Sequence, residues 1–89
     1  MSRIKTFDQE VMAFICISVY PRDRYPQVIS EIVRMNSIKE IYGVTGEYDL
    51  LLKLQVKSMK EFSEVLGKIS SLAGVAKTYT MVVVDLIKP

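Results

Sequence analysis

The 89-residue sequence contains no histidine, no tryptophan and a single cysteine, Cys16. Without histidine, the chain lacks the side chain that ordinarily titrates between pH 5 and 8, which excludes a histidine-based acid–base site. One cysteine forms no disulfide within the chain, and cysteine and histidine together supply too few ligands for a zinc site. We therefore expect no metal and no cofactor.

The sequence also has no strong excess of positive or negative charge and no long apolar run. The net charge is +2 and no basic run is present, which argues against nucleic acid as the main partner. No apolar stretch approaches the roughly 20 residues of a membrane span. The first residues, Met1 to Thr6, lack the apolar core of a signal peptide. These absences predict a soluble, cytoplasmic protein.

Hydrophobic residues make up 49% of the sequence, which is rich for so short a chain. A domain of this size buries only about 60% of the surface that its unfolded chain exposes. The apolar surplus therefore predicts self-association. We expect a lead-in over residues 1–9 and one domain over residues 10–89.

Hydrophobic spacing predicts four strands and two helices. Apolar residues alternate or run continuously in the strand segments, whereas they recur at helical spacing after Pro26 and after the capping box of Ser58 and Glu61. The strands are expected over residues 11–19, 38–44, 50–56 and 75–87, and the helices over residues 26–35 and 59–72.

An internal repeat indicates how these elements combine. When the chain is shifted by 37 residues, the apolar positions of the first strand and helix coincide with those of the third strand and second helix. The chain is therefore a βαβ unit used twice. Interlocked, the two units give an α+β, ferredoxin-like βαββαβ plait: a four-stranded antiparallel sheet with two helices on one face.

The helices cover one face of this sheet and leave the other open. The repeat places Ile15, Leu52 and their alternating neighbours toward the helices, so the opposite face is largely apolar. Because the repeat pairs Tyr79 with Tyr42, we expect Tyr79 to face the helices as well. An apolar open face is typical of a protein interface. We therefore predict a homodimer with packed sheets, whose interface includes Phe14, Cys16, Leu51 and Val82.

A short polar corner, residues 44–49, joins the second and third strands. Two β-rich runs joined through a few residues that include glycine are typical of a hairpin. Gly46 is expected to adopt a positive φ, which glycine alone reaches without steric cost. Asp49 either hydrogen-bonds to backbone two residues further on or keeps its carboxylate for another partner.

The corner, Ile41-Tyr42-Gly43-Val44-Thr45-Gly46-Glu47-Tyr48-Asp49-Leu50-Leu51-Leu52, and the later segment Gly74-Val75-Ala76-Lys77-Thr78-Tyr79-Thr80 resemble a known family. They are similar to the effector-binding (RAM) domain of the leucine-responsive regulatory protein/AsnC (Lrp/AsnC) transcriptional regulators. Full-length members also carry a helix-turn-helix domain, whereas about ten residues precede the first strand here. The chain thus resembles the stand-alone RAM proteins, and no direct nucleic-acid binding is expected.

The resemblance implies an α/β-barrel dimer, a ring of dimers that is often an octamer, and small amino acids bound between dimers. The positions that match the family's effector site are Gly46, Glu47, Tyr48, Asp49, Thr78 and Thr80. Their chemistry suits a zwitterion, because a carboxylate pairs with an ammonium and hydroxyl groups both donate and accept hydrogen bonds. A full-length Lrp/AsnC-type regulator is a further expected partner.

Two other functions stay open on the sequence alone. One is a structural oligomerisation module without a ligand, in which the corner is only a turn and Thr78 and Thr80 are ordinary strand residues. The other is a small dimeric ferredoxin-like oxygenase. The absence of histidine disfavours that enzyme, since the apolar face offers only Lys53 and Asp85 as ionisable groups. We therefore expect a regulatory protein and not an enzyme.

Overall fold

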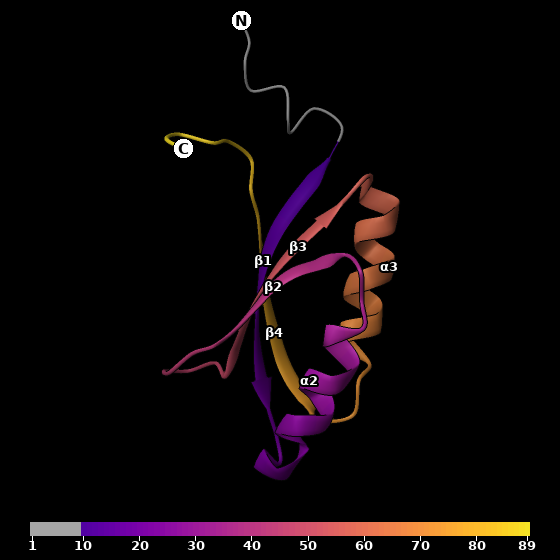
Figure 1. The fold of residues 1–89 in the computed structure, drawn as a ribbon, viewed down its shortest axis with the longest axis vertical. Coiled ribbons are helices and arrows are strands. Elements are labelled where there is room, and N and C mark those ends of the chain that lie inside the picture. Colours follow the sequence, from indigo (N-terminus) through magenta and orange to yellow (C-terminus); the bar gives the residue numbers. More distant parts are fainter. Residues whose placement is uncertain (1–9) are drawn as a thin grey trace, which may run out of the picture.

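A computed structural model describes residues 10–89, so the expected lead-in lies outside the described residues. The elements, in order, are β1 (Val11–Val19), the 3-10 turn η1 (Arg22–Arg24), α2 (Tyr25–Val33), β2 (Ile38–Gly43), β3 (Leu50–Val56), α3 (Met59–Ser70) and β4 (Val75–Val82). The strands pair antiparallel in the order β2-β3-β1-β4. Both helices lie on one face of this sheet (Figure 1). The predicted ferredoxin-like βαββαβ plait is confirmed.

The helices begin where the sequence signals place them. Pro26 occupies the first turn of α2, where its missing N–H costs nothing. The Ser58 hydroxyl caps α3 by accepting a hydrogen bond from the Glu61 backbone N–H at 3.1 Å. The Glu61 carboxylate returns to the N–H of Lys57, at 3.1 Å, instead of that of Ser58. One of the two backbone donors that this box satisfies therefore belongs to Lys57, the residue before the cap.

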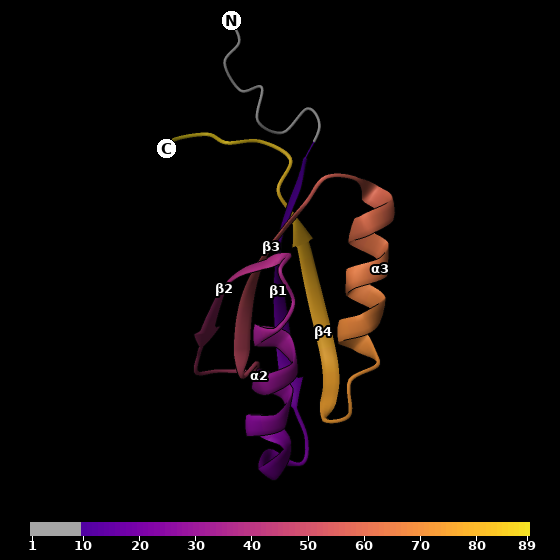
Figure 2. The ribbon, with the colours of Figure 1, turned by 45° about the vertical axis from the view of Figure 1, so that its right-hand side comes forward.

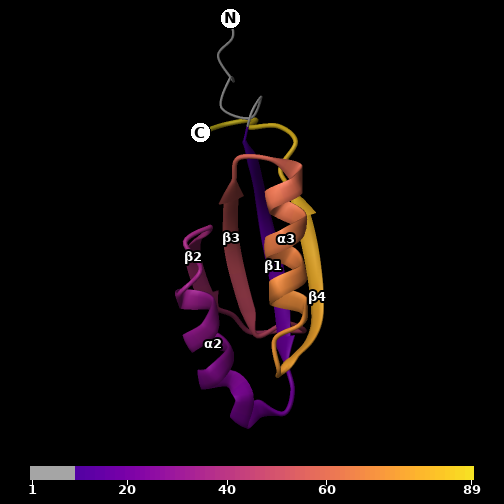
Figure 3. The same cartoon turned by 90° about the vertical axis from the view of Figure 1, so that its right-hand side faces the viewer.

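The core lies between the sheet and the two helices. Alternate residues of β1 and β3 are buried there, as the period of two predicts. In Figure 3, which looks onto the helices, α2 lies toward β2 and α3 lies in front of β1 and β4. The buried residues are Ala13, Ile15, Ile17, Val19, Val28, Ile32, Leu50, Leu52, Leu54, Val56, Phe62, Val65 and Ile69.

Two β-bulges reveal the internal repeat in the backbone. In β2 the register skips Lys39, because Ile38 pairs with Leu54 and Glu40 with Lys53. In β4 it skips Ala76 in the same way, between Val75 and Lys77. The two bulged residues are 37 positions apart (76 − 39 = 37), which is the offset of the repeat. Each βαβ unit therefore carries a bulge at the same place in its second strand.

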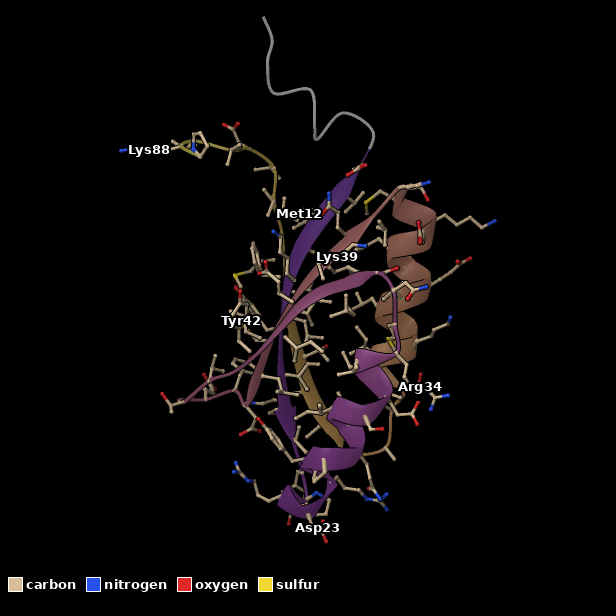
Figure 4. The ribbon with its side chains drawn as sticks, viewed as in Figure 1. Met12, Asp23, Arg34, Lys39, Tyr42 and Lys88 are labelled. Carbon is tan, nitrogen blue, oxygen red and sulfur yellow. The ribbon has the colours of Figure 1, made fainter. Side chains whose placement is uncertain are left out.

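These bulges overturn one prediction about the faces of the sheet. A bulge adds one residue, so it reverses which side chains point to which face. Tyr79 pairs with Cys16 and Tyr42 with Leu51, so both tyrosines lie on the face away from the helices. Figure 4 shows the Tyr42 side chain on that side. The repeat matched the two tyrosines correctly, but the prediction that Tyr79 faces the helices is wrong.

The bulge in β4 also changes the face on which Val82 lies. Val82 was expected on the face away from the helices. Val82 pairs with Ala13 and therefore lies on the helix side of the sheet, where it is 42% exposed. The face that the helices leave free is called the open face below; in Figure 1 it is the left-hand side of the sheet, and Figure 2 shows the sheet from the helix side. It carries Met12, Phe14, Cys16, Ser18, Glu40, Tyr42, Leu51, Lys53, Gln55, Lys77, Tyr79 and Met81.

The last strand is shorter than the sequence predicts. It ends at Val82, whereas the apolar run continues to Ile87. The Val83 N–H still donates to the Met12 carbonyl at 2.8 Å, but the residues after Val82 form no strand. We call residues 83–89, which follow β4, the C-terminal arm.

Candidate functional site

The corner between β2 and β3, residues 44–49, projects from the sheet on the side away from the helices (Figure 1). Gly46 has a φ of 113°, the positive value that the sequence predicts. The Val44 N–H donates to the Asp49 carbonyl at 3.0 Å and closes the base of the corner. The Asp49 N–H donates to the Ile17 carbonyl at 2.8 Å, so the base is also tied to β1.

The Asp49 carboxylate fixes the corner to the end of β1. Its Oδ2 accepts a hydrogen bond from the Val19 N–H at 2.7 Å, and its Oδ1 accepts one from Arg22 Nη1 at 3.0 Å. The side chain of Asp49 is 21% exposed, whereas that of Arg22 is 77% exposed. The Asp49 carboxylate therefore forms no hydrogen bond within the turn, and neither of its oxygen atoms is left without a partner. It holds a neighbouring strand and an exposed guanidinium in place.

The tip of the corner lies against the start of β4 on the open face. The Tyr48 and Tyr79 rings stack with their centroids 6.3 Å apart. Lys77 Nζ lies 5.6 Å from the Tyr48 ring centroid and 3.7 Å from Glu47 Oε2. We call Glu47, Tyr48, Lys77 and Tyr79 the corner cluster. It presents an exposed anion, an exposed cation and aromatic surface within one small area.

Thr78 and Thr80 lie apart from this cluster. They pair with Ile17 and Ile15, so their partly buried side chains point to the helix side of the sheet. Within one chain the sheet therefore separates both threonines from Tyr48. Of the six predicted site residues, the structure brings together Gly46, Glu47, Tyr48 and Asp49 in one corner, but neither threonine joins them.

Three neighbours of the corner were not predicted from the sequence: Arg22, Lys77 and Tyr79. Lys77 and Tyr79 follow from the two-residue period of β4 once Tyr79 is known to pair with Cys16. The bulge at Ala76 conceals that register in the sequence. Arg22 lies in the turn after β1 and belongs to no motif, so only the fold reveals its contact with Asp49.

Other surface features lie away from the corner. One cavity of about 340 Å³ lies at the opposite end of the sheet, and one of about 330 Å³ lies beside Arg24 and Leu72. Residues 10–89 contain no group of three or more cysteine, histidine, aspartate or glutamate side chains that would hold a metal ion. Over the same residues, neither helix is long and apolar enough to cross a membrane.

The sequence and fold match a known family. A family model described as the Lrp/AsnC ligand binding domain matches residues 12–89. This chain belongs to the Lrp/AsnC family. The resemblance predicted from the corner motif is therefore confirmed, and the matched domain is a regulatory, ligand-binding one.

The chain is similar to parts of two different kinds of protein, a transcriptional regulator and an enzyme. The HTH-type transcriptional regulator FL11 of Pyrococcus furiosus is 36% identical over 78 residues, which cover 88% of this chain and 51% of FL11. The chain thus spans about half the length of the FL11 regulators that it matches. A homocitrate synthase of Sulfolobus acidocaldarius is 25% identical over 84% of this chain and 16% of the synthase.

Solved structures share the fold. TTHA0845 of Thermus thermophilus is 29% identical with a TM-score of 0.81, and the match covers 89% of this chain and 99% of that one. The regulator NMB0573 of Neisseria meningitidis, in complex with L-methionine, is 24% identical with a TM-score of 0.82 over 100% and 59% of the two chains. The regulatory protein Rv3291c of M. tuberculosis, also complexed with L-methionine, is 19% identical with a TM-score of 0.75 over 89% and 53%. These last two show the fold alone.

Proposed function

We propose that this Lrp/AsnC domain binds a free amino acid beside the corner of residues 44–49 and changes its assembly in response. The observation that carries the proposal is the family match over residues 12–89, since the matched family is a ligand-binding one. Two regulators with the same fold are solved in complex with L-methionine. L-Methionine is therefore the first effector to test.

The corner cluster offers the chemistry that an amino acid requires. Lys77 supplies a cation for the effector carboxylate, and Glu47 supplies an anion for its ammonium group. Gly46 leaves its backbone open, because no atom lies within 4 Å of the position that a Cβ would occupy. The Tyr48 ring provides apolar surface for the side chain of the effector. Asp49 holds these groups in position through Val19 and Arg22.

The proposed site is completed by another copy of the chain. In a single chain the corner cluster is exposed surface, with Glu47 74% and Lys77 58% exposed. Thr78 and Thr80 belong to β4, which is an edge strand. They reach an effector only where the corner of a neighbouring copy meets that edge. A ligand held between copies stabilises the assembly by mass action.

The proposed assembly is a homodimer formed by the open faces, with dimers joined in a ring such as an octamer. The support is the apolar character of that face, on which Phe14, Cys16 and Leu51 are partly exposed. Tyr79 and Met81, which are 54% and 42% exposed, take the place that was expected for Val82. Apolar surface gathered in this way is typical of an interface core.

A thermal-shift screen of the common L-amino acids at millimolar concentration tests the proposed ligand. A ligand at about 100 times its dissociation constant adds about 2.7 kcal/mol to the free energy of unfolding, which raises the melting temperature by about 10 °C or more. Lys77→Ala removes the proposed carboxylate partner and abolishes the shift. The exposed Lys60→Ala on α3 is the control and keeps it. A screen without any shift favours the structural oligomerisation module.

A full-length Lrp/AsnC-type regulator is the proposed protein partner, because FL11 shares this domain at 36% identity. The match within a homocitrate synthase supports a second candidate, an enzyme that carries the same domain. Native mass spectrometry of this chain mixed with each purified partner separates the two. Mixed assemblies with only one partner identify it, whereas assemblies of this chain with itself alone contradict both.

A further inference from the structure

The C-terminal arm carries three exposed apolar side chains, two of which are almost fully exposed. Val84 is 88% exposed, Ile87 84% and Leu86 45%. Scattered apolar residues are ordinary on a protein surface, but here three of four consecutive residues are apolar, with Asp85 between the first two. The arm is tied to its own sheet at its first residue, through the bond from the Val83 N–H to the Met12 carbonyl. Val84 and Ile87 are therefore left almost uncovered in the described part of the chain, and Leu86 is about half covered.

The direction of the arm places it on the side of the open face. In Figures 1 and 2 the segment leaves the end of β4 and turns away from α2 and α3. Figure 4 shows Lys88, near the end of the arm, far out on that side. The open face at the root of the arm carries Met12, Phe14 and Met81, all of them apolar. An exposed apolar segment and an exposed apolar surface thus share one side of the molecule.

We propose that the C-terminal arm is exchanged between two copies and packs Val84, Leu86 and Ile87 on the open face of the other copy. This inference rests on the face-to-face dimer of the proposed function. The arm has seven residues, which span about 20 Å when extended. Packed sheets lie about 10 Å apart, so the arm is long enough to cross to the partner sheet. A two-fold axis makes the contact reciprocal, because each copy supplies one arm and one face.

The composition of the arm favours a second copy over a charged partner. Its two ionisable side chains, Asp85 and Lys88, cancel in charge, and the remaining positions are apolar or proline. Such a segment matches an apolar surface like that around Phe14 and Met81 better than an acidic or basic one. Because both surfaces are present in every copy, the pairing needs no other protein.

Sedimentation equilibrium of arm variants tests the exchange. One variant ends after Val83, which keeps the bond to Met12, and a second, full-length variant carries Val84→Ser and Ile87→Ser. The control ends after Ile87 and loses only Lys88 and Pro89. Each arm variant is expected to raise the dimer dissociation constant at least about tenfold, whereas the control stays within about twofold. The proposal is overturned if the arm variants keep the dimer dissociation constant of the wild type, or if they weaken only the association of dimers with one another.

A cross-linking measurement locates the arm directly. A photoreactive benzoylphenylalanine replaces Leu86, and isotopically heavy and light chains are mixed before irradiation. The proposal predicts heavy–light cross-linked peptides that contain Phe14 or Met81. Cross-links confined to chains of one isotope overturn it. A full-length chain that is monomeric at every concentration contradicts the dimer itself, whereas a full-length dimer that is indifferent to truncation contradicts the arm alone.

Discussion

At the scale of single residues, Asp49 has the most consequential contacts at the corner. Its carboxylate binds the part-buried Val19 N–H and the Arg22 guanidinium, two partners that lie about 30 positions earlier in the chain. The sequence shows an acidic residue after a glycine, which is compatible with a turn or with a ligand contact. The sequence does not show that the Asp49 carboxylate hydrogen-bonds to β1, because that contact exists only after β1 and β3 have paired.

Asp49→Ala is expected to destabilise the fold as well as the site. The substitution leaves the part-buried Val19 N–H without its acceptor, which costs about 1–3 kcal/mol in the free energy of unfolding. Urea denaturation measures the loss. Asp23→Ala, an exposed carboxylate in η1, is the control and changes stability by less than about 0.5 kcal/mol. Equal stabilities for the two variants would contradict the role assigned to Asp49.

Tyr42 is expected to titrate at a higher pH than an ordinary tyrosine. Its hydroxyl donates to Glu40 Oε1 at 2.8 Å, and this bond, with the negative charge of Glu40, raises the pKa of Tyr42. A raised pKa in the folded state means that this contact stabilises the fold below the ordinary value of about 10, and that the stabilisation is lost as the pH rises through the raised value. Glu40→Gln lowers the pKa of Tyr42.

Ultraviolet difference titration measures this effect. The difference between the wild type and Tyr42→Phe isolates the Tyr42 signal from those of the other four tyrosines. The same difference in the Glu40→Gln background is expected to move to lower pH. An identical titration in both backgrounds would show that Glu40 does not set the pKa of Tyr42.

At the scale of elements, the sequence predicted most of the secondary structure and missed its irregularities. The expected bounds of β1 and β3 are those of the structure, because continuous alternation and flanking turn residues define both strands. The bulges at Lys39 and Ala76 were not visible, since skipping one residue leaves the composition of a strand unchanged. That single omission reversed the faces assigned to Tyr79 and Val82.

Three glycines give a matched test of how the elements are connected. Gly74 has a φ of 99°, and a Cβ there would lie 2.7 Å from Arg24 Cβ, so Gly74→Ala combines backbone strain with a steric clash. Gly46→Ala adds strain alone, since its surroundings are open. Gly67 lies within α3 with open space around it, so Gly67→Ala raises stability by about 0.5–1 kcal/mol.

Melting temperatures of the three variants provide the measurement. Gly67→Ala is expected to melt above the wild type, Gly46→Ala below it and Gly74→Ala lowest. The strain at Gly46 corresponds to about 1–2 kcal/mol, and the clash at Gly74 adds to a similar strain. A Gly74→Ala variant as stable as Gly46→Ala would contradict the close packing of η1 against the turn before β4.

At the scale of the whole molecule, the open face is the surface that we propose as the dimer interface. Met81 on β4 and Met59 on α3 offer a matched pair, because both are exposed, at 42% and 57%, but only Met81 lies on the open face. Met81→Glu places a charge in the proposed interface and is expected to shift the protein toward monomers. Met59→Glu leaves the assembly unchanged. Light scattering coupled to size exclusion measures both, and equal masses would contradict the face-to-face dimer.

The central claim, that the corner of an Lrp/AsnC domain binds an amino acid, is tested most directly by isothermal titration calorimetry. The amino acid with the largest thermal shift, with L-methionine as the first candidate, is titrated into the wild type, Lys77→Ala and Lys60→Ala. We expect saturable binding to the wild type and to Lys60→Ala, and at least about tenfold weaker binding to Lys77→Ala. Equal affinity for all three proteins would place the ligand elsewhere, and no binding to any of them would contradict the effector site.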